Sequence, residues 1–154
     1  MATQNLFIPF SDWAKITPDV VVLAEFKANI SDPKDGNSYS VAIVGHHANS
    51  LIGKKVGDQI DGIFVGLPGY KLKITGGSDK DGFPMRKDIP GPKRMRVLIS
   101  KGLGFKPEMG GERRRKTMRG SAISPDIFQV NLRVVNYGAK AIKDLVKKEE
   151  KKES

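Results

Sequence analysis

The sequence contains no cysteine, only two histidines and few aromatic residues. Without cysteine the chain forms no disulfide and offers no thiolate to a metal, which fits a reducing compartment. His46 and His47 are adjacent, so on a strand they would point to opposite faces, and we expect no metal site. The sequence also shows no triad-like arrangement of serine, histidine and aspartate. We therefore expect no enzyme, no cofactor and no small-molecule substrate.

Long apolar runs are absent as well. No window approaches the ~18 consecutive apolar residues that a membrane-spanning helix needs, and we expect no membrane partner. The first twenty residues lack the basic start and the apolar run of a secretory signal. A length of 154 residues with 38% hydrophobic content fits one ordinary domain with a modest core.

Positive charge is concentrated in one part of the chain. The net charge is +10, and residues 86–119 hold twelve basic and three acidic side chains, a local net charge of +9. Such a concentration costs self-repulsion, which a polyanion usually offsets. An anionic membrane face would need a basic amphipathic helix, and the glycines and prolines here prevent one. The charge pattern therefore favours a nucleic acid.

Glycine is abundant in the same part of the chain. Gly62–Gly120 contains twelve glycines and five prolines, interleaved with most of the arginines. Guanidinium groups fork onto phosphate oxygens, and glycine allows the backbone to approach a phosphate chain closely. A solvated basic loop or a localisation signal is the alternative, but length, glycine content and charge asymmetry favour RNA binding. Because Gly102–Gly120 has few apolar side chains, we expect it to become ordered only when RNA binds.

Short strands dominate the expected fold. Alternation in Val20–Ile30 and in Ser38–Val44, separated by a turn-rich stretch, predicts a hairpin. Further strands are predicted at Gln59–Val65, Tyr70–Thr75, Arg94–Ser100 and Ile127–Val135, the last with Phe128, Val130, Leu132 and Val134 on its buried face. Helical spacing predicts a short helix at His46–Lys54 and a C-terminal amphipathic helix at Ala139–Glu150.

These elements predict a mainly β protein. We expect residues 1–19 to form an N-terminal extension and residues 20–138 to form a small β-barrel of about six strands with one internal helix. The basic Gly/Arg-rich segment 86–120 is expected to be an extended part of this domain. Residues 139–154 are expected to form a C-terminal helix and a charged tail.

The segment Ile74–Met85, ITGGSDKDGFPM, is the second conspicuous feature. It does not end in the GKS or GKT of a nucleotide-binding phosphate loop. Asp79, Asp81 and Gly82 mimic part of a calcium loop, but no glutamate closes the twelve-residue frame. On the residues alone, a strand that enters a tight structural turn is the better interpretation.

Several segments together resemble a known family. ITGGSDKDGFPM looks like the signature of the eukaryotic and archaeal family of small-subunit ribosomal protein six, which is unrelated to the bacterial protein of that number. The other matching segments follow in chain order and are FKANISDPKDGNSY (Phe26–Tyr39), LIGKKVGDQIDG (Leu51–Gly62), RMRVLISKG (Arg94–Gly102) and GERRRKTMRG (Gly111–Gly120). The resemblance implies a structural constituent of the small ribosomal subunit, located on cytoplasmic ribosomes, whose partners are small-subunit ribosomal RNA and neighbouring ribosomal proteins.

The same resemblance implies which residues contact ribosomal RNA. They are Arg94, Arg96, Lys101, Arg113, Arg114, Arg115, Lys116 and Arg119, with Lys80, Phe83 and Arg86 around the signature loop as further candidates. Eukaryotic members continue into a long basic helix and a serine-rich tail, whereas this chain stops at Ser154, so it resembles the short archaeal form. The alternative is an RNA-binding β-barrel that acts off the ribosome.

Overall fold

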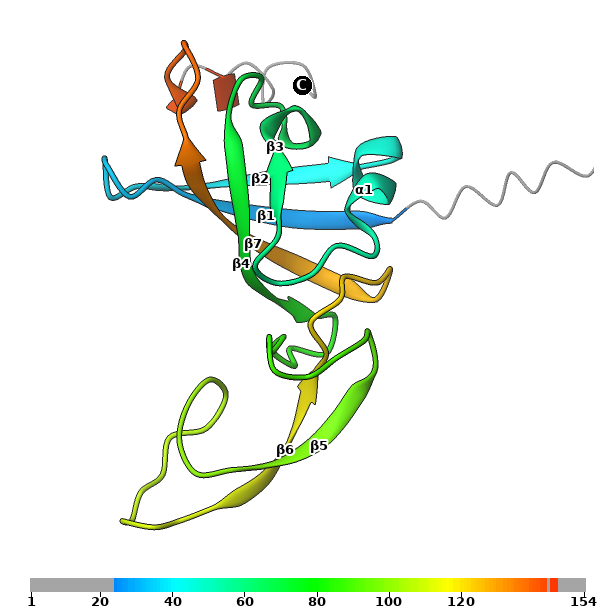
Figure 1. Ribbon diagram of the computed structural model, residues 1–154, viewed down its shortest axis with the longest axis vertical. Coiled ribbons are helices and arrows are strands. Elements are labelled where there is room, and N and C mark those ends of the chain that lie inside the picture. Colours follow the sequence, from blue (N-terminus) through cyan, green and yellow to red (C-terminus); the bar gives the residue numbers. More distant parts are fainter. Residues whose placement is uncertain (1–23, 144, 147–154) are drawn as a thin grey trace, which may run out of the picture.

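The computed structural model describes residues 24–143, 145 and 146 (Figure 1). The expected extension, residues 1–19, and most of the charged tail lie outside the described residues. The elements in chain order are β1 (Glu25–Ser31), β2 (Ser38–Val44), α1 (His46–Leu51), β3 (Gln59–Asp61), the 3-10 helix η2 (Gly62–Val65), β4 (Lys71–Asp79), β5 (Arg94–Ile99), β6 (Arg114–Arg119) and β7 (Ile127–Asn136).

Five of the strands form one curled sheet, the main sheet, in the order β2-β1-β7-β4-β3. The β1–β7 pair is parallel, and the other pairs are antiparallel. The mainly β fold is thus confirmed, but a barrel of about six strands is not. Within the described residues the main sheet keeps β2 and β3 as edge strands, and β5 leaves it to pair with β6 elsewhere.

The predicted first hairpin is confirmed. Paired residues run from Glu25 opposite Val44 to Ser31 opposite Ser38, and Gly36 supplies the positive φ of 69° that the turn needs. Asp32 accepts hydrogen bonds from the backbone N–H of Lys34 and from the Tyr137 hydroxyl, both at its Oδ1 atom. Burial alone would raise the pKa of Asp32, but these hydrogen bonds outweigh burial and lower it.

The core lies on one side of the main sheet. Alternate residues of the strands point into it and are buried, namely Phe26, Ala28, Ile30, Ile43, Ile60, Leu72, Ile74, Val130, Leu132 and Val134. Leu51 of α1 and Val65 of η2 cover this side and belong to the same cluster. Burial of such apolar side chains, each contributing ~1.5–3 kcal/mol, is the main stabilising term of the domain.

Several predicted boundaries differ in the structure. The helix predicted at His46–Lys54 is present as α1 but ends at Leu51. The strand predicted over Gln59–Val65 ends at Asp61, because the chain turns at Gly62, whose carbonyl accepts the N–H of Leu67 at 2.8 Å. A Cβ at Gly62 would lie 2.2 Å from the Leu67 carbonyl oxygen, so the turn depends on glycine. The predicted strand Tyr70–Thr75 is extended in β4 to Asp79, through the two glycines of the signature segment.

Phe128 does not have the predicted buried position. Its side chain is 51% exposed, whereas its neighbour Ile127 is fully buried. A register shift in the β4–β7 pair explains this, because Ser78 pairs with Gln129 and Asp79 with Ile127, which leaves Phe128 as an extra residue. Such a bulge reverses the side-chain alternation.

The C-terminal amphipathic helix is not confirmed. Helical backbone is described for residues 142, 143, 145 and 146, and the remainder of the predicted helix beyond residue 146 lies outside the described residues. The apolar positions Ile142 and Val146 are nevertheless buried in the main core. Among the described residues no helix is long and apolar enough to cross a membrane.

Candidate nucleic-acid interface

Strands β5 and β6 form a separate two-stranded hairpin, the arm, that extends away from the main sheet (Figure 1). The sequence predicts an extended segment here but no strand at Arg114–Arg119, which pair with Arg94–Ile99 along their whole length. A second small core stabilises the arm, with Ile89, Ile99 and Met118 buried against Val97 and Phe105. The interstrand hydrogen bonds and this core offset part of the ordering entropy.

The two faces of the arm have different characters. Residues directly opposite each other on antiparallel strands share a face. Ile99, Val97 and Met118 therefore turn toward the small core, and the other face carries Arg94, Arg96, Leu98, Arg115, Thr117 and Arg119. The sequence pattern could not show this, because β6 begins with three exposed cations and lacks an apolar alternation.

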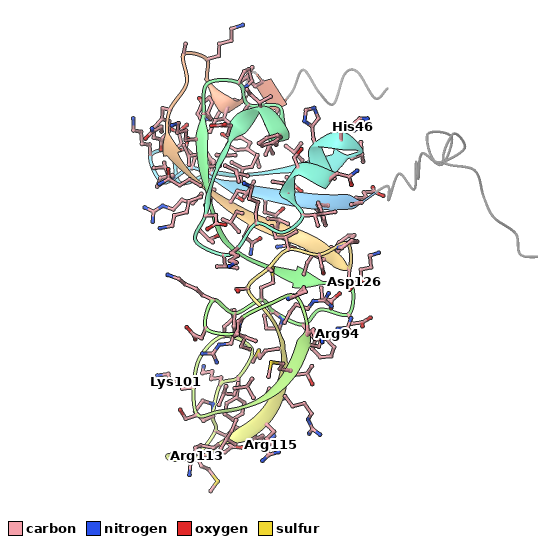
Figure 2. All side chains as sticks on the ribbon, turned by 45° about the vertical axis from the view of Figure 1, so that its right-hand side comes forward. His46, Arg94, Lys101, Arg113, Arg115 and Asp126 are labelled. Carbon is pink, nitrogen blue, oxygen red and sulfur yellow. The ribbon has the colours of Figure 1, made fainter. Side chains whose placement is uncertain are left out.

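Several predicted RNA contacts are exposed cations on the arm. Arg96, Lys101, Arg113 and Arg115 are exposed and form no ion pair among the described residues. Figure 2 shows Arg113 and Arg115 toward the free end of the arm, with Lys101 higher on it and Arg94 near the main sheet. This spacing distributes positive charge along the length of the arm.

Two other cations of the arm have partners within it. Arg114 forms an ion pair with Glu112 at 2.5 Å. The ammonium group of Lys116 lies 6.0 Å from the centre of the Phe105 ring, at the outer limit of a cation–π contact. Both side chains remain exposed. An exposed ion pair contributes little, so a phosphate can compete for either cation.

Arg119 differs from the other predicted contacts. It is only 5% exposed, and its guanidinium group donates to Asp79, Ser124 and Asp126, each at 2.6 Å. Arg94 also donates to Asp79, at 2.7 Å, and forms an ion pair with Asp81. The arginines that open β5 and close β6 are therefore engaged at the base of the arm.

Asp79 is the centre of this ion cluster. Its carboxylate is buried and accepts from Arg94, from Arg119 and from the backbone N–H of Lys80. Burial raises the pKa of Asp79 as the largest single effect, but these hydrogen bonds and the two guanidinium charges outweigh it and lower the pKa. The carboxylate stays ionised at neutral pH and holds both strands of the arm.

The signature segment thus has a structural purpose. Gly77 allows β4 to approach β7, since a Cβ there would lie 2.3 Å from the carbonyl oxygen of Gln129. The turn after Asp79 closes with a hydrogen bond from Gly82 N–H to the Asp79 carbonyl. The prediction of a strand that enters a structural turn agrees with this geometry, but it did not identify Asp79 as an anchor.

The remaining candidates lie around that turn. Phe83 is half-buried beneath Arg94, whose guanidinium carbon is 5.2 Å from the ring centre. Arg86 forms an ion pair with Asp88 at 2.7 Å, and Lys80 is exposed. The structure therefore brings Phe83 to the base of the arm and leaves Lys80 available to a polyanion.

The two histidines of the chain lie away from the arm. His46 lies on α1, on the far side of the main sheet from the arm (Figure 2), and His47 packs edge-on against Phe64. Among the described residues no three histidine, aspartate or glutamate side chains are grouped so that they could hold a metal ion. What the arrangement offers is a set of positioned guanidinium and ammonium groups, which suit phosphate oxygens.

The fold and the arm define a small basic β protein that presents cations on a projecting hairpin. The sequence model of the family described as "Ribosomal protein S6e" matches residues 26–147, and the chain belongs to this family. This confirms the resemblance seen in the sequence, and the family comprises structural ribosomal components rather than enzymes.

Individual relatives cover most of the chain. It is 56% identical over 131 residues to the small ribosomal subunit protein eS6 of Methanocella arvoryzae, an alignment of 85% of this chain and 92% of that protein. It is 52% identical over 120 residues to eS6 of Methanoculleus marisnigri, covering 78% of this chain and 91% of the relative. With eS6 of Archaeoglobus fulgidus the identity is 51% over 127 residues, covering 82% and 98%. These are archaeal proteins, as the resemblance to the short form predicts.

Proposed function

We propose that this chain is a structural constituent of the small ribosomal subunit in cytoplasmic ribosomes and that the arm binds ribosomal RNA. The exposed cations along a hairpin that projects from the main sheet carry this proposal. Membership of the S6e family and the names of its relatives support the ribosomal setting.

The arm suits RNA because its strands are paired and anchored at their base, which positions the cations. The six paired positions of β5 and β6 fix the spacing of the side chains between them, and the ion cluster at Asp79 ties the base of the arm to the main sheet. We propose that the arm is ordered before it binds, in place of the ordering on RNA binding expected from the sequence, because a preordered hairpin loses less entropy when it meets phosphates. Arg96, Arg113 and Arg115 provide forked donors to phosphate oxygens.

Apolar side chains on the arm suggest how neighbouring ribosomal proteins take part. Met95, Leu98, Leu103 and Met109 are all at least half exposed, although the arm is otherwise strongly cationic. Exposed apolar groups next to cations match surfaces that meet RNA and protein together. Contacts with adjacent small-subunit proteins would cover these groups after assembly.

The salt dependence of RNA binding tests the proposal. Replacing Arg96, Arg113 and Arg115 by glutamine should flatten the slope of log affinity against log salt for a ribosomal RNA fragment by about two to three. The matched control replaces Lys54, Lys55 and Lys140, which are exposed and lie outside the arm, by glutamine. If the arm variant has the slope of the control, RNA binds elsewhere.

Sedimentation separates the ribosomal function from an RNA-binding module that acts off the ribosome. The native protein should sediment with small subunits at low salt and be released at high salt, because phosphate contacts weaken as salt rises. A protein found mostly in the free fraction at low salt would favour the alternative.

A further inference from the structure

The main sheet has a second polar surface that is separate from the arm. The outer face is defined as the central part of the sheet surface that points away from the core, and it consists of Ser40, Ala42, Lys27, Asn29, Ser31, Gln129, Asn131, Arg133, Lys73, Thr75 and Gln59. Each of these residues alternates with a buried or half-buried neighbour on its strand. None of these eleven is acidic or aromatic, so they offer mainly hydroxyl, amide and cationic groups. The acidic residues on the same side of the sheet lie outside this set, Glu25 at the start of β1 and Asp61 opposite Lys71.

The charges on the outer face repel one another. Lys73 of β4 lies directly opposite Arg133 of β7 in the antiparallel ladder. Like charges in such a pair are destabilising, and neither side chain has an ion-pair partner among the described residues. Lys27 on β1 adds a third exposed cation. A polyanion bound to this face would remove the repulsion.

Amide groups lie between the cations. Lys27 lies opposite Gln129, and Gln129 is four residues before Arg133 on β7. Lys27 and Arg133 are therefore about 13 Å apart along the strand direction. Asn29 and Asn131 are paired between them, and the Gln129 amide donates to the Asn131 side-chain oxygen at 2.7 Å. The outer face therefore has cations at two ends and neutral donors and acceptors between them.

We propose that the outer face binds the minor groove of double-helical RNA. This groove is wide and shallow and presents 2′-hydroxyl groups between two phosphate chains. Asn29 and Asn131 can donate to and accept from those hydroxyls, while Lys27, Lys73 and Arg133 reach the phosphates on either side. The eleven residues include no aromatic ring, and the exposed ring of Phe128 lies beyond them near the start of β7. A row of unpaired bases would therefore find no stacking platform across this face, which disfavours single-stranded RNA.

The test uses the full chain with Lys27, Lys73 and Arg133 replaced by glutamine. The control is the variant with glutamine at Lys54, Lys55 and Lys140, which loses the same charge from other exposed positions. The probes are an RNA duplex of about 16 base pairs, its single strand and a DNA duplex of the same sequence. We expect the outer-face variant to bind the RNA duplex roughly tenfold more weakly than the control does. Its plot of log affinity against log salt should be shallower by about two to three.

The outcomes separate this proposal from binding by the arm. The proposal is overturned if the outer-face variant and the control bind the RNA duplex equally well. It is also overturned if the outer-face variant loses as much affinity for single-stranded RNA or for the DNA duplex as for the RNA duplex, because such a loss indicates only general charge attraction. The arm variant should weaken all three probes, so its failure would count against the arm alone. Lys73→Gln, which removes the repulsion from Arg133, should unfold at the same or a higher urea concentration than wild type. A lower midpoint would show that the cations stabilise the fold itself and would also contradict the proposal.

Discussion

The guanidinium group of Arg119 in β6 donates to the Asp79 carboxylate at the end of β4 over 2.6 Å. Both side chains are almost fully buried, and they are 40 positions apart in the sequence. Because Arg94 donates to the same oxygen, one carboxylate binds the first residue of β5 and the last residue of β6. The position of the arm relative to the main sheet therefore depends on this contact.

Arg119→Gln should destabilise the protein strongly. The substitution leaves the buried Asp79 without one of its two cations, and breaking a buried ion pair in this way costs about 3–5 kcal/mol. Urea denaturation would measure the change. Arg115→Gln on the same strand is the control, because Arg115 is exposed and should change stability by no more than about 0.5 kcal/mol. Similar unfolding midpoints for the two variants would show that Arg119 is not a structural anchor.

Acid should weaken the same contact. The pKa of Asp79 is lowered in the folded protein, so the folded state binds its proton less readily than the unfolded chain does. The ionised carboxylate therefore adds stability above about pH 4, the range of an unfolded aspartate, and this contribution disappears as pH falls through the lowered folded value. Asp79→Asn lacks the contribution at every pH.

Urea unfolding of wild type and Asp79→Asn across pH 3 to 7 checks this expectation. The difference between their unfolding free energies should be largest near pH 7 and should shrink toward the acid end. Asp81→Asn serves as the control, since Asp81 is mostly exposed and forms an ion pair with Arg94 as well. A difference that stays constant with pH would mean that the charge of Asp79 does not matter.

The two neighbouring glycines of β4 should respond differently to alanine. A Cβ at Gly77 would lie 2.3 Å from the carbonyl oxygen of Gln129 and 3.1 Å from the Met85 sulfur, whereas at Gly76 it meets nothing within 4 Å. Gly77→Ala should therefore cost about 1–3 kcal/mol through backbone displacement. Gly76→Ala should be neutral or slightly stabilising, by up to about 1 kcal/mol. Thermal unfolding of the pair measures this, and equal effects would contradict the close approach of β4 to β7.

Local patterns in the sequence were sufficient for several elements. The β1–β2 hairpin and strands β5 and β7 were predicted because alternation and turn residues act over a few neighbouring positions. β6 was missed, since Arg114–Lys116 offer no apolar alternation and the strand exists through its pairing with β5. The cationic arm was predicted as an RNA contact, but the burial of Arg119 depends on Asp79, which is distant in the sequence.

Phe128 shows the same limit within a single strand. A period of two assigns it to the same face as Val130, yet a bulge opposite Ser78 and Asp79 turns it outward. Register shifts arise from the partner strand, so they leave no mark on the strand itself.

Phe26 and Phe128 provide the corresponding stability test. Phe26 is fully buried in the core cluster, so Phe26→Ala should cost about 3–5 kcal/mol through lost burial and the cavity that remains. Phe128→Ala removes a half-exposed ring and should cost far less, within about 1 kcal/mol. Urea midpoints of the two variants, compared with wild type, measure the contrast. Equal and large losses would mean that β7 follows a plain alternation without the bulge, and that the ring of Phe128 belongs to the core.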